Sequence, residues 1–135
     1  MKKAYRYNFE NLDVWKLSIE FARDIYKVTE SFPKTENFGL VSQIRRAVVS
    51  ISSNLAEGSA KQSLKDQARF TEISFGSLME TLNQMIIAVE LGYIKEKDYL
   101  ELRRKYVEEL SKKLSSLKNS QLKRYKNKST ISSQL

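Results

Sequence analysis

The sequence predicts an all-α fold, an up-and-down antiparallel bundle of four helices. Apolar residues recur at steps of three and four in four long segments, the period of a helix with one buried face. The 135 residues include only 4 glycines and 1 proline, so few positions favour turns. The links between the segments are short, and short links join antiparallel neighbours in a bundle. The helices are expected at about residues 12–30, 39–57, 64–91 and 97–117.

The chain divides into an extended arm at 1–10, the bundle at 11–118 and a basic tail at 119–135. In the arm, Tyr5, Tyr7 and Phe9 alternate with polar residues, which is the period of an extended chain. We favour packing of these rings on the bundle, and the alternative is stacking on nucleic-acid bases. The tail has no acidic residue and little periodicity, which is typical of a disordered segment or of one that a partner orders.

The first helix ends before Pro33, because the residue before a proline avoids the α region. It carries two apolar stripes that together cover an arc of roughly 220°, more than a small bundle covers. One stripe is therefore expected to contact another subunit, and either could do so. The second stripe comprises Leu12, Trp15, Ile19, Ala22 and Tyr26. The interface is assigned to four residues of the first: Val14, Leu17, Phe21 and Ile25.

The second helix and the corner after it organise the bundle. Its buried seam is predicted to contain Val41, Ile44, Val48, Ile51 and Leu55, and its other side is rich in serine. Asn54, Glu57 and Gly58 form a hinge motif, in which Gly58 is expected to end the helix at a positive φ. Ser63, followed three residues later by Asp66, is the capping pattern that opens the third helix.

Two glycines have predicted roles in the third helix. Gly76 lies in its middle and costs up to roughly 1 kcal/mol relative to alanine. The expected reason is a close crossing with the small face of the second helix. Gly92 should end the third helix. The core stripe of the fourth helix is predicted as Tyr99, Leu102, Tyr106, Leu110, Leu114 and Leu117.

The composition excludes several kinds of site. Cysteine and histidine are absent, so disulfides, thiol nucleophiles, the commonest general base and the commonest zinc ligands are excluded. We expect no catalytic residue, no cofactor and no metal site. An Mg²⁺ site of Glu57, Glu72 and Glu80 is the alternative; we favour a structural role for Glu57, in pairing with arginine or capping backbone donors. No apolar run approaches the roughly 20 residues of a membrane span, so a cytoplasmic protein is expected.

The net charge of +8 belongs to the two ends of the chain. Three of the 24 basic residues precede residue 10 and five follow residue 117, which leaves 16 in the body beside 16 acidic residues. Lys61, Lys65 and Arg69 recur every four residues and could line a helix edge that binds phosphates, with Arg45 and Arg46 on the facing helix. The remaining candidate contacts are Lys123, Arg124, Lys126 and Lys128. The alternatives are a solvated helix face and a solubilising tail.

An ordered series of motifs also resembles a known family. The motifs are Leu12-x-Val14-Trp15, Phe32-Pro33, Phe38-Gly39-Leu40, Gln43-Ile44-Arg45-Arg46-Ala47, Ser50-Ile51-x-x-Asn54-Leu55-Ala56-Glu57-Gly58, Gly76-Ser77-Leu78 and Leu91-Gly92-Tyr93-Ile94. Residues 9–117 thereby resemble the four-helix-bundle family of 23S rRNA intervening-sequence proteins. The resemblance implies a ring-like homopentamer and a relation to retroelement accessory proteins, which associate with nucleic acid and a reverse transcriptase. It implies no established activity.

These observations lead to one preferred function and one alternative. We expect a non-enzymatic homo-oligomer, pentameric by the resemblance, that binds RNA or a ribonucleoprotein through its basic patches. The alternative is a protein-interaction scaffold without nucleic-acid binding. In both cases the chain is its own partner, and no membrane is involved.

Overall fold

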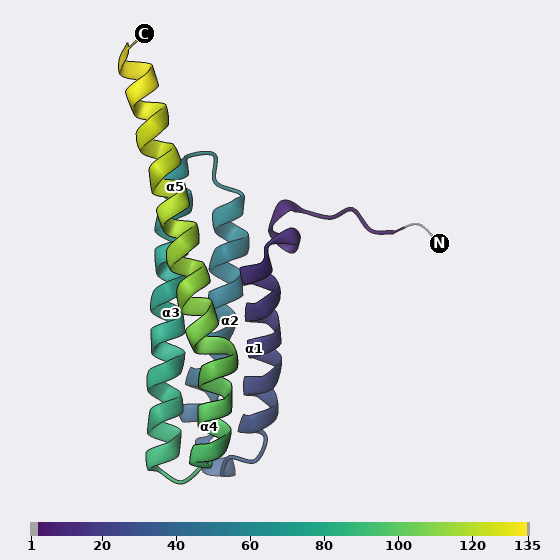
Figure 1. The fold of residues 1–135 in the computed structure, drawn as a ribbon. Coiled ribbons are helices and arrows are strands. Elements are labelled where there is room, and N and C mark those ends of the chain that lie inside the picture. The colour runs from purple at the N-terminus through teal and green to yellow at the C-terminus, as the bar shows by residue number, and fades with distance from the viewer. Residues whose placement is uncertain (1–2, 135) are drawn as a thin grey trace.

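The structure, a computed structural model, describes residues 3–134, and these form a bundle of four helical rods (Figure 1). The first three rods are α1 (Asp13–Thr29), α2 (Leu40–Ser59) and α3 (Leu64–Glu90). The fourth is a continuous rod of α4 (Glu96–Leu102), a π-helical segment (Arg103–Glu108) and α5 (Glu109–Gln134). Short 3₁₀ turns precede α1 (Asn8–Asn11) and α2 (Lys34–Glu36). The described residues include no strand, so the predicted all-α four-helix bundle is confirmed.

The rods are arranged around one core. α2 packs between α1 and α3, and α5 packs on α3 and α1, so α1 and α3 lie at opposite corners (Figure 1). All five predicted seam residues of α2 are buried. None of the helices in the described part of the chain has the length and apolar character that crossing a bilayer requires.

The interface assigned to the first stripe of α1 is wrong for three of its four residues. Val14, Phe21 and Ile25 are buried within the bundle, Phe21 and Ile25 with 0% exposure, and Leu17 is partly buried. The ring of Phe21 stacks on that of Tyr106, with centroids 5.0 Å apart. The exposed apolar side chains of α1 belong to the second stripe, where Ile19 and Tyr26 are each 41% exposed. Periodicity shows that two stripes exist, but the positions of the neighbouring helices decide which is covered.

Gly58 does not end α2 in the expected way. It lies inside the helix, and among the described residues only Gly92 has a positive φ, of 78°. A Cβ atom on Gly58 would lie 2.7 Å from the Cβ of Phe70 on α3. The missing side chain therefore serves the close approach of α2 and α3. The corner follows at residues 60–63, where the Ser63 hydroxyl accepts a hydrogen bond from the Asp66 backbone at 3.3 Å, which confirms the predicted cap.

Gly76 has no packing role in the bundle, contrary to prediction. A Cβ atom there would meet nothing within 4 Å. The small face of α2 instead contacts serines of α3. The Ser50 and Ser77 hydroxyls lie 2.9 Å apart, and the Ser74 hydroxyl donates to the Ile51 carbonyl at 2.9 Å. The predicted role of Gly92 is confirmed, since it follows α3 with a positive φ.

The fourth rod differs from the prediction at two places. Its π-helical segment widens one turn, so that Tyr106 and Val107 both enter the core, whereas the regular stripe included Tyr106 alone. The rod also continues to Gln134 instead of ending near 117, so the expected disorder from 119 is not what the structure shows. No glycine or proline follows Gly92, and α5 remains in contact with α3 through Gln121, whose amide oxygen accepts from Thr71 at 2.8 Å.

A partly buried polar contact joins the fourth rod to α1. The Tyr106 hydroxyl donates a hydrogen bond to the Asp24 carboxylate. Burial, and then this hydrogen bond, raise the pKa of Tyr106 above its ordinary value near 10. The stabilising effect of the neutral phenol is therefore complete below pH 10 and is lost as the pH rises through the higher folded-state pKa.

We expect the free energy of unfolding to fall between pH 9 and pH 11 by more in the native protein than in Tyr106→Phe. The difference should approach about 1.4 kcal/mol for each pH unit above 10, because the unfolded state releases the phenol proton first. Urea unfolding at both pH values measures it. The two proteins differ only at residue 106, so the comparison isolates the contribution of Tyr106. Equal losses in the two proteins would show that Tyr106 does not cause the decline.

Candidate nucleic-acid interface

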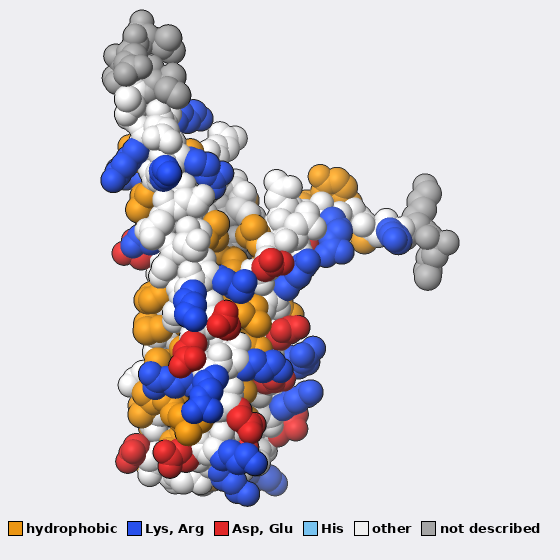
Figure 2. All heavy atoms as spheres, in the orientation of Figure 1, with side chains coloured by type: hydrophobic (Ala, Val, Ile, Leu, Met, Phe, Trp, Pro, Cys, Tyr) orange, Lys and Arg blue, Asp and Glu red, His pale blue; other side chains and the backbone are white. Residues whose placement is uncertain are grey.

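Three segments that are distant in sequence meet at one end of the bundle: the turn before α1, the α2–α3 corner, and α5 beyond Leu117 (Figure 1). The cations of this end are Lys61, Lys65, Arg69, Lys118, Lys123, Arg124, Lys126 and Lys128, here called the basic end. The acidic residues of these segments are fewer: Glu10 in the turn before α1, Glu57, Asp66 and Glu72. Figure 2 shows Lys and Arg side chains on the part of α5 that projects beyond the bundle. The chain's positive excess thus lies largely at this end.

Most cations of the basic end are available to a ligand. Lys118 lies 3.8 Å from the carboxylate of Glu72, and both side chains are partly exposed. Lys61 and Arg69 lie over the ring of Phe70, at 5.0 and 5.8 Å from its centroid. Lys65 and the four cations from 123 to 128 are exposed and form no ion pair with a described residue. At 100° per residue those four point in different directions around α5, so the charge surrounds the helix.

Arg45 and Arg46 do not belong to this site, which corrects the predicted grouping. They lie near the start of α2, about 20 Å along the helix from Gly58 at 1.5 Å per residue. Arg45 is occupied there: its guanidinium donates to the Thr29 hydroxyl at 2.9 Å and to the Tyr26 carbonyl at 3.2 Å, and lies 4.5 Å from the Tyr26 ring centroid. The corner residues and Arg45 are thus near opposite ends of α2.

The hinge motif lies within α2. The amide of Asn54 donates to the carbonyl and hydroxyl of Ser50, at 2.8 and 2.9 Å. Glu57 is exposed, and its carboxylate has no partner among the described residues, so neither arginine pairing nor capping explains it. Across residues 3–134, no cluster of three or more acidic side chains is placed to hold a metal ion.

Of the arm's three rings, one packs on the bundle. Phe9 is partly buried and contacts Trp15 edge to face, with centroids 5.2 Å apart. Tyr5 and Tyr7 are exposed and contact each other at 5.0 Å. The packing predicted for the arm is therefore found at Phe9 only.

Sequence reasoning missed Gln121, which is 7% exposed and lines a cavity at the basic end. A signal was present, since Gln121 follows Leu110, Leu114 and Leu117 in the same helical phase. Because the residues after Leu117 are largely polar, the predicted core stripe ends at Leu117.

Two apolar surfaces remain uncovered on the protomer. Ile19, Tyr26, Phe38 and Val49 form the α1/α2 apolar face, on which Phe38 is 100% exposed and lines a groove with Tyr26 and Val49. Ile73, Ile87 and Leu91, the last just after the helix, lie on one side of α3 and are here called the α3 apolar stripe, in which exposed Glu80 separates Ile73 from Ile87. The α1/α2 apolar face and the α3 apolar stripe involve different residues of the protomer, and α1 and α3 lie at opposite corners of the bundle.

Residues 10–116 match the family model described as 23S rRNA-intervening sequence protein. The chain belongs to this family. It is also similar to the crystal structure of a protein with unknown function from the S23 ribosomal protein family of Bacteroides thetaiotaomicron. The two are 27% identical, with a TM-score of 0.68, over 77% of this chain and 96% of the other. No curated protein matches the chain.

The family match confirms the resemblance inferred from the motifs. It covers the four rods of the bundle and stops before the projecting part of α5. Five of the eight cations of the basic end, from Lys118 onward, therefore lie outside the matched region.

Proposed function

We propose that this protein is a non-enzymatic homo-oligomer of the cytoplasm that binds RNA or a ribonucleoprotein through its basic end. The observation that carries the proposal is the gathering of unpaired cations at one end, on a helix that projects beyond the bundle (Figures 1 and 2). Cations that neutralise phosphates release counterions, which favours binding of any polyanion without reading its sequence. Because the body between residues 10 and 117 is neutral, the end and not a broad face is the expected contact.

The two apolar surfaces support a ring. A protomer with two different apolar surfaces makes head-to-tail contacts, which close into a ring when the rotation permits. The α1/α2 apolar face would meet the α3 apolar stripe of the next protomer, where the open space at Gly76 allows close approach. A pentamer is the form that the family resemblance implies. With all bundles aligned, the basic ends would share one rim, and several weak contacts would bind RNA with high avidity.

A protein-interaction scaffold is the second candidate, and the groove beside Phe38 favours it. An aromatic side chain that is fully exposed beside Tyr26 and Val49 could contact a partner protein in place of a second copy of the chain. In that case the basic end would serve solubility alone.

Neutralising the projecting cations tests the proposal. Replacing Lys123, Arg124, Lys126 and Lys128 by glutamine should weaken binding of a structured RNA and make its salt dependence shallower. Each phosphate contact contributes about 0.7 to 0.9 to the slope of log affinity against log salt, so the loss of four should reduce that slope by about 3. Neutralisation is preferable to truncation after residue 118, which would remove Gln121 from Thr71.

The matched control removes the same charge from the other end of the bundle, with glutamine at exposed Lys27, Lys34, Lys95 and Lys97. Sedimentation equilibrium gives the mass of each protein, so that loss of the oligomer is not mistaken for loss of contacts. Equal weakening in both variants, or an affinity that does not change with salt, would contradict RNA binding at the basic end. An oligomer that binds no RNA would favour the scaffold.

A further inference from the structure

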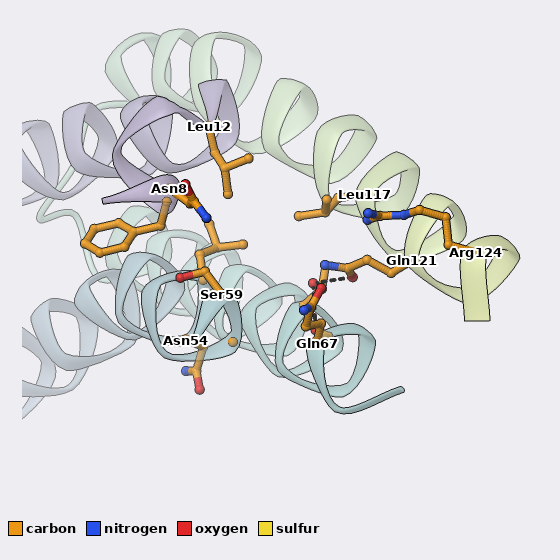
Figure 3. A pocket seen from close by; sticks show the side chains of 12 residues that line it. Asn8, Leu12, Asn54, Ser59, Gln67, Leu117, Gln121 and Arg124 are labelled. Carbon is orange, nitrogen blue, oxygen red and sulfur yellow. Dashed lines mark hydrogen bonds between the residues drawn. The ribbon is translucent and has the colours of Figure 1, made fainter. Parts of the chain in front are cut away.

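A cavity of about 260 Å³ opens at the basic end, between the turn before α1, the α2–α3 corner and α5 (Figure 3). Its walls are apolar at Phe9, Leu12, Leu55 and Leu117. Figure 3 shows Asn8, Ser59 and Gln67 around the space, with Gln121 and Arg124 reaching it from α5. Apolar walls with a few placed polar groups are the usual composition of a small-ligand site, although this cavity lies just below the roughly 300–1,000 Å³ of drug-sized sites.

The Gln121 side-chain amide makes one hydrogen bond among the described residues, through its oxygen. Thr71 is placed to donate its single hydroxyl hydrogen both to the Gln121 oxygen, at 2.8 Å, and to the Gln67 carbonyl, at 3.1 Å. When Gln121 accepts it, the two N–H groups of the amide have no acceptor among the described residues. When Gln67 accepts it, the amide can turn over and donate to Thr71, which leaves its oxygen unpaired. Either way, a nearly buried amide offers unused hydrogen bonds to the cavity.

Arg124 is the one charged residue among those that line the cavity. Its side chain runs back along α5 to the mouth, near Leu117 (Figure 3). A single guanidinium matches a ligand with one phosphate, to which it can donate two parallel hydrogen bonds. The site thus combines a phosphate-binding group at the mouth with an unpaired amide and apolar walls inside.

We propose that the cavity binds a single nucleotide, with the base against Gln121 and the phosphate on Arg124. Proteins recognise unstacked bases by side-chain hydrogen bonds and by contact with aromatic rings, and here Phe9 supplies the ring. The inference rests on the proposed function, in that it takes nucleic-acid chemistry as the ligand. A free nucleoside monophosphate and an unpaired nucleotide within an RNA strand present the same groups, and the experiment separates them.

Trp15 is the sole tryptophan and contacts Phe9 of the cavity wall, so its fluorescence reports binding. The full chain is titrated with AMP, CMP, GMP and UMP, and separately with an unstructured six-nucleotide RNA, at constant moderate salt. Calorimetry in parallel measures binding that leaves the fluorescence unchanged. The variants are Gln121→Leu and Arg124→Gln, and the matched control is Arg104→Gln, which removes an exposed arginine outside the basic end that does not line the cavity.

Saturable binding that weakens about tenfold or more in Gln121→Leu and in Arg124→Gln, and about twofold or less in Arg104→Gln, is the expected result. If the monophosphates show this pattern, a free nucleotide is a sufficient ligand. If only the hexanucleotide shows it, the ligand is an unpaired nucleotide within an RNA strand. Either supports the proposal. No saturable binding of either ligand overturns it, as do equal losses in Arg124→Gln and Arg104→Gln or full affinity in Gln121→Leu.

Failure of this site is distinguishable from failure of RNA binding. Gln121→Leu removes no charge, so the salt slope for structured RNA should equal that of the native protein. If structured RNA binds with the expected salt slope but neither the monophosphates nor the hexanucleotide bind in the cavity, the nucleotide site is wrong and the basic end is retained. If the variant with glutamine at 123, 124, 126 and 128 binds structured RNA with unchanged affinity, the basic end is not the RNA-binding site, whether or not the monophosphates bind.

Discussion

Replacing Phe21 by alanine should lower the free energy of unfolding by about 3–5 kcal/mol, the usual cost of truncating a buried phenylalanine. The side chain is fully buried in the core of the bundle and stacks on Tyr106, with centroids 5.0 Å apart. Its removal exchanges these contacts for a cavity that the surrounding helices cannot fill without moving. Urea unfolding of the native protein and of Phe21→Ala measures the difference.

Ile19→Ala is the matched control on the same helix, because Ile19 is 41% exposed. It should change the unfolding free energy of the protomer by less than about 1 kcal/mol, as most surface substitutions do. If the α1/α2 apolar face contacts another protomer, the mass of the assembly should fall in Ile19→Ala. If Phe21→Ala instead changed the free energy of unfolding only slightly and lowered the mass of the assembly, Phe21 would belong to the subunit interface.

Gly58→Ala should destabilise the protein by about 1–3 kcal/mol, the range for overpacking a close contact. The added Cβ would lie 2.7 Å from the Cβ of Phe70, so α2 and α3 would have to separate at the corner. Truncating Phe70 to alanine should not relieve the clash, because alanine keeps that Cβ atom. Unfolding of Gly58→Ala, alone and combined with Phe70→Ala, measures both effects.

Gly76→Ala is the control for Gly58→Ala, since both glycines lie inside helices without a positive φ. Nothing lies within 4 Å of a Cβ at Gly76, so alanine should stabilise the protomer there by up to about 1 kcal/mol through its better helix propensity. Destabilisation by Gly76→Ala, or a gain in Gly58→Ala, would reverse the roles that the structure assigns to the two glycines.

Local patterns account for the parts of the fold that sequence reasoning predicted correctly. The starts and ends of α1, α2 and α3 were predicted to within about two residues, because periodicity, Pro33 and the Ser63 cap act over a few neighbouring residues. The Lys61 to Arg69 spacing was also local, and these cations do lie at the candidate site. The grouping of Arg45 and Arg46 with them failed, because about 20 Å of helix separates these arginines from Gly58 beside the corner.

The amino-acid pattern alone therefore determines an all-α bundle, the buried seam of α2 and the position of the excess charge at the ends of the chain. Packing decides the rest. It buries Phe21 and leaves Ile19 exposed, it requires glycine at 58 and not at 76, and it holds Gln121 against Thr71 in a helix that continues past residue 117. Each of these depends on a side chain from a distant segment. Helix periodicity reports a residue's direction around its own axis and carries no information about what lies opposite.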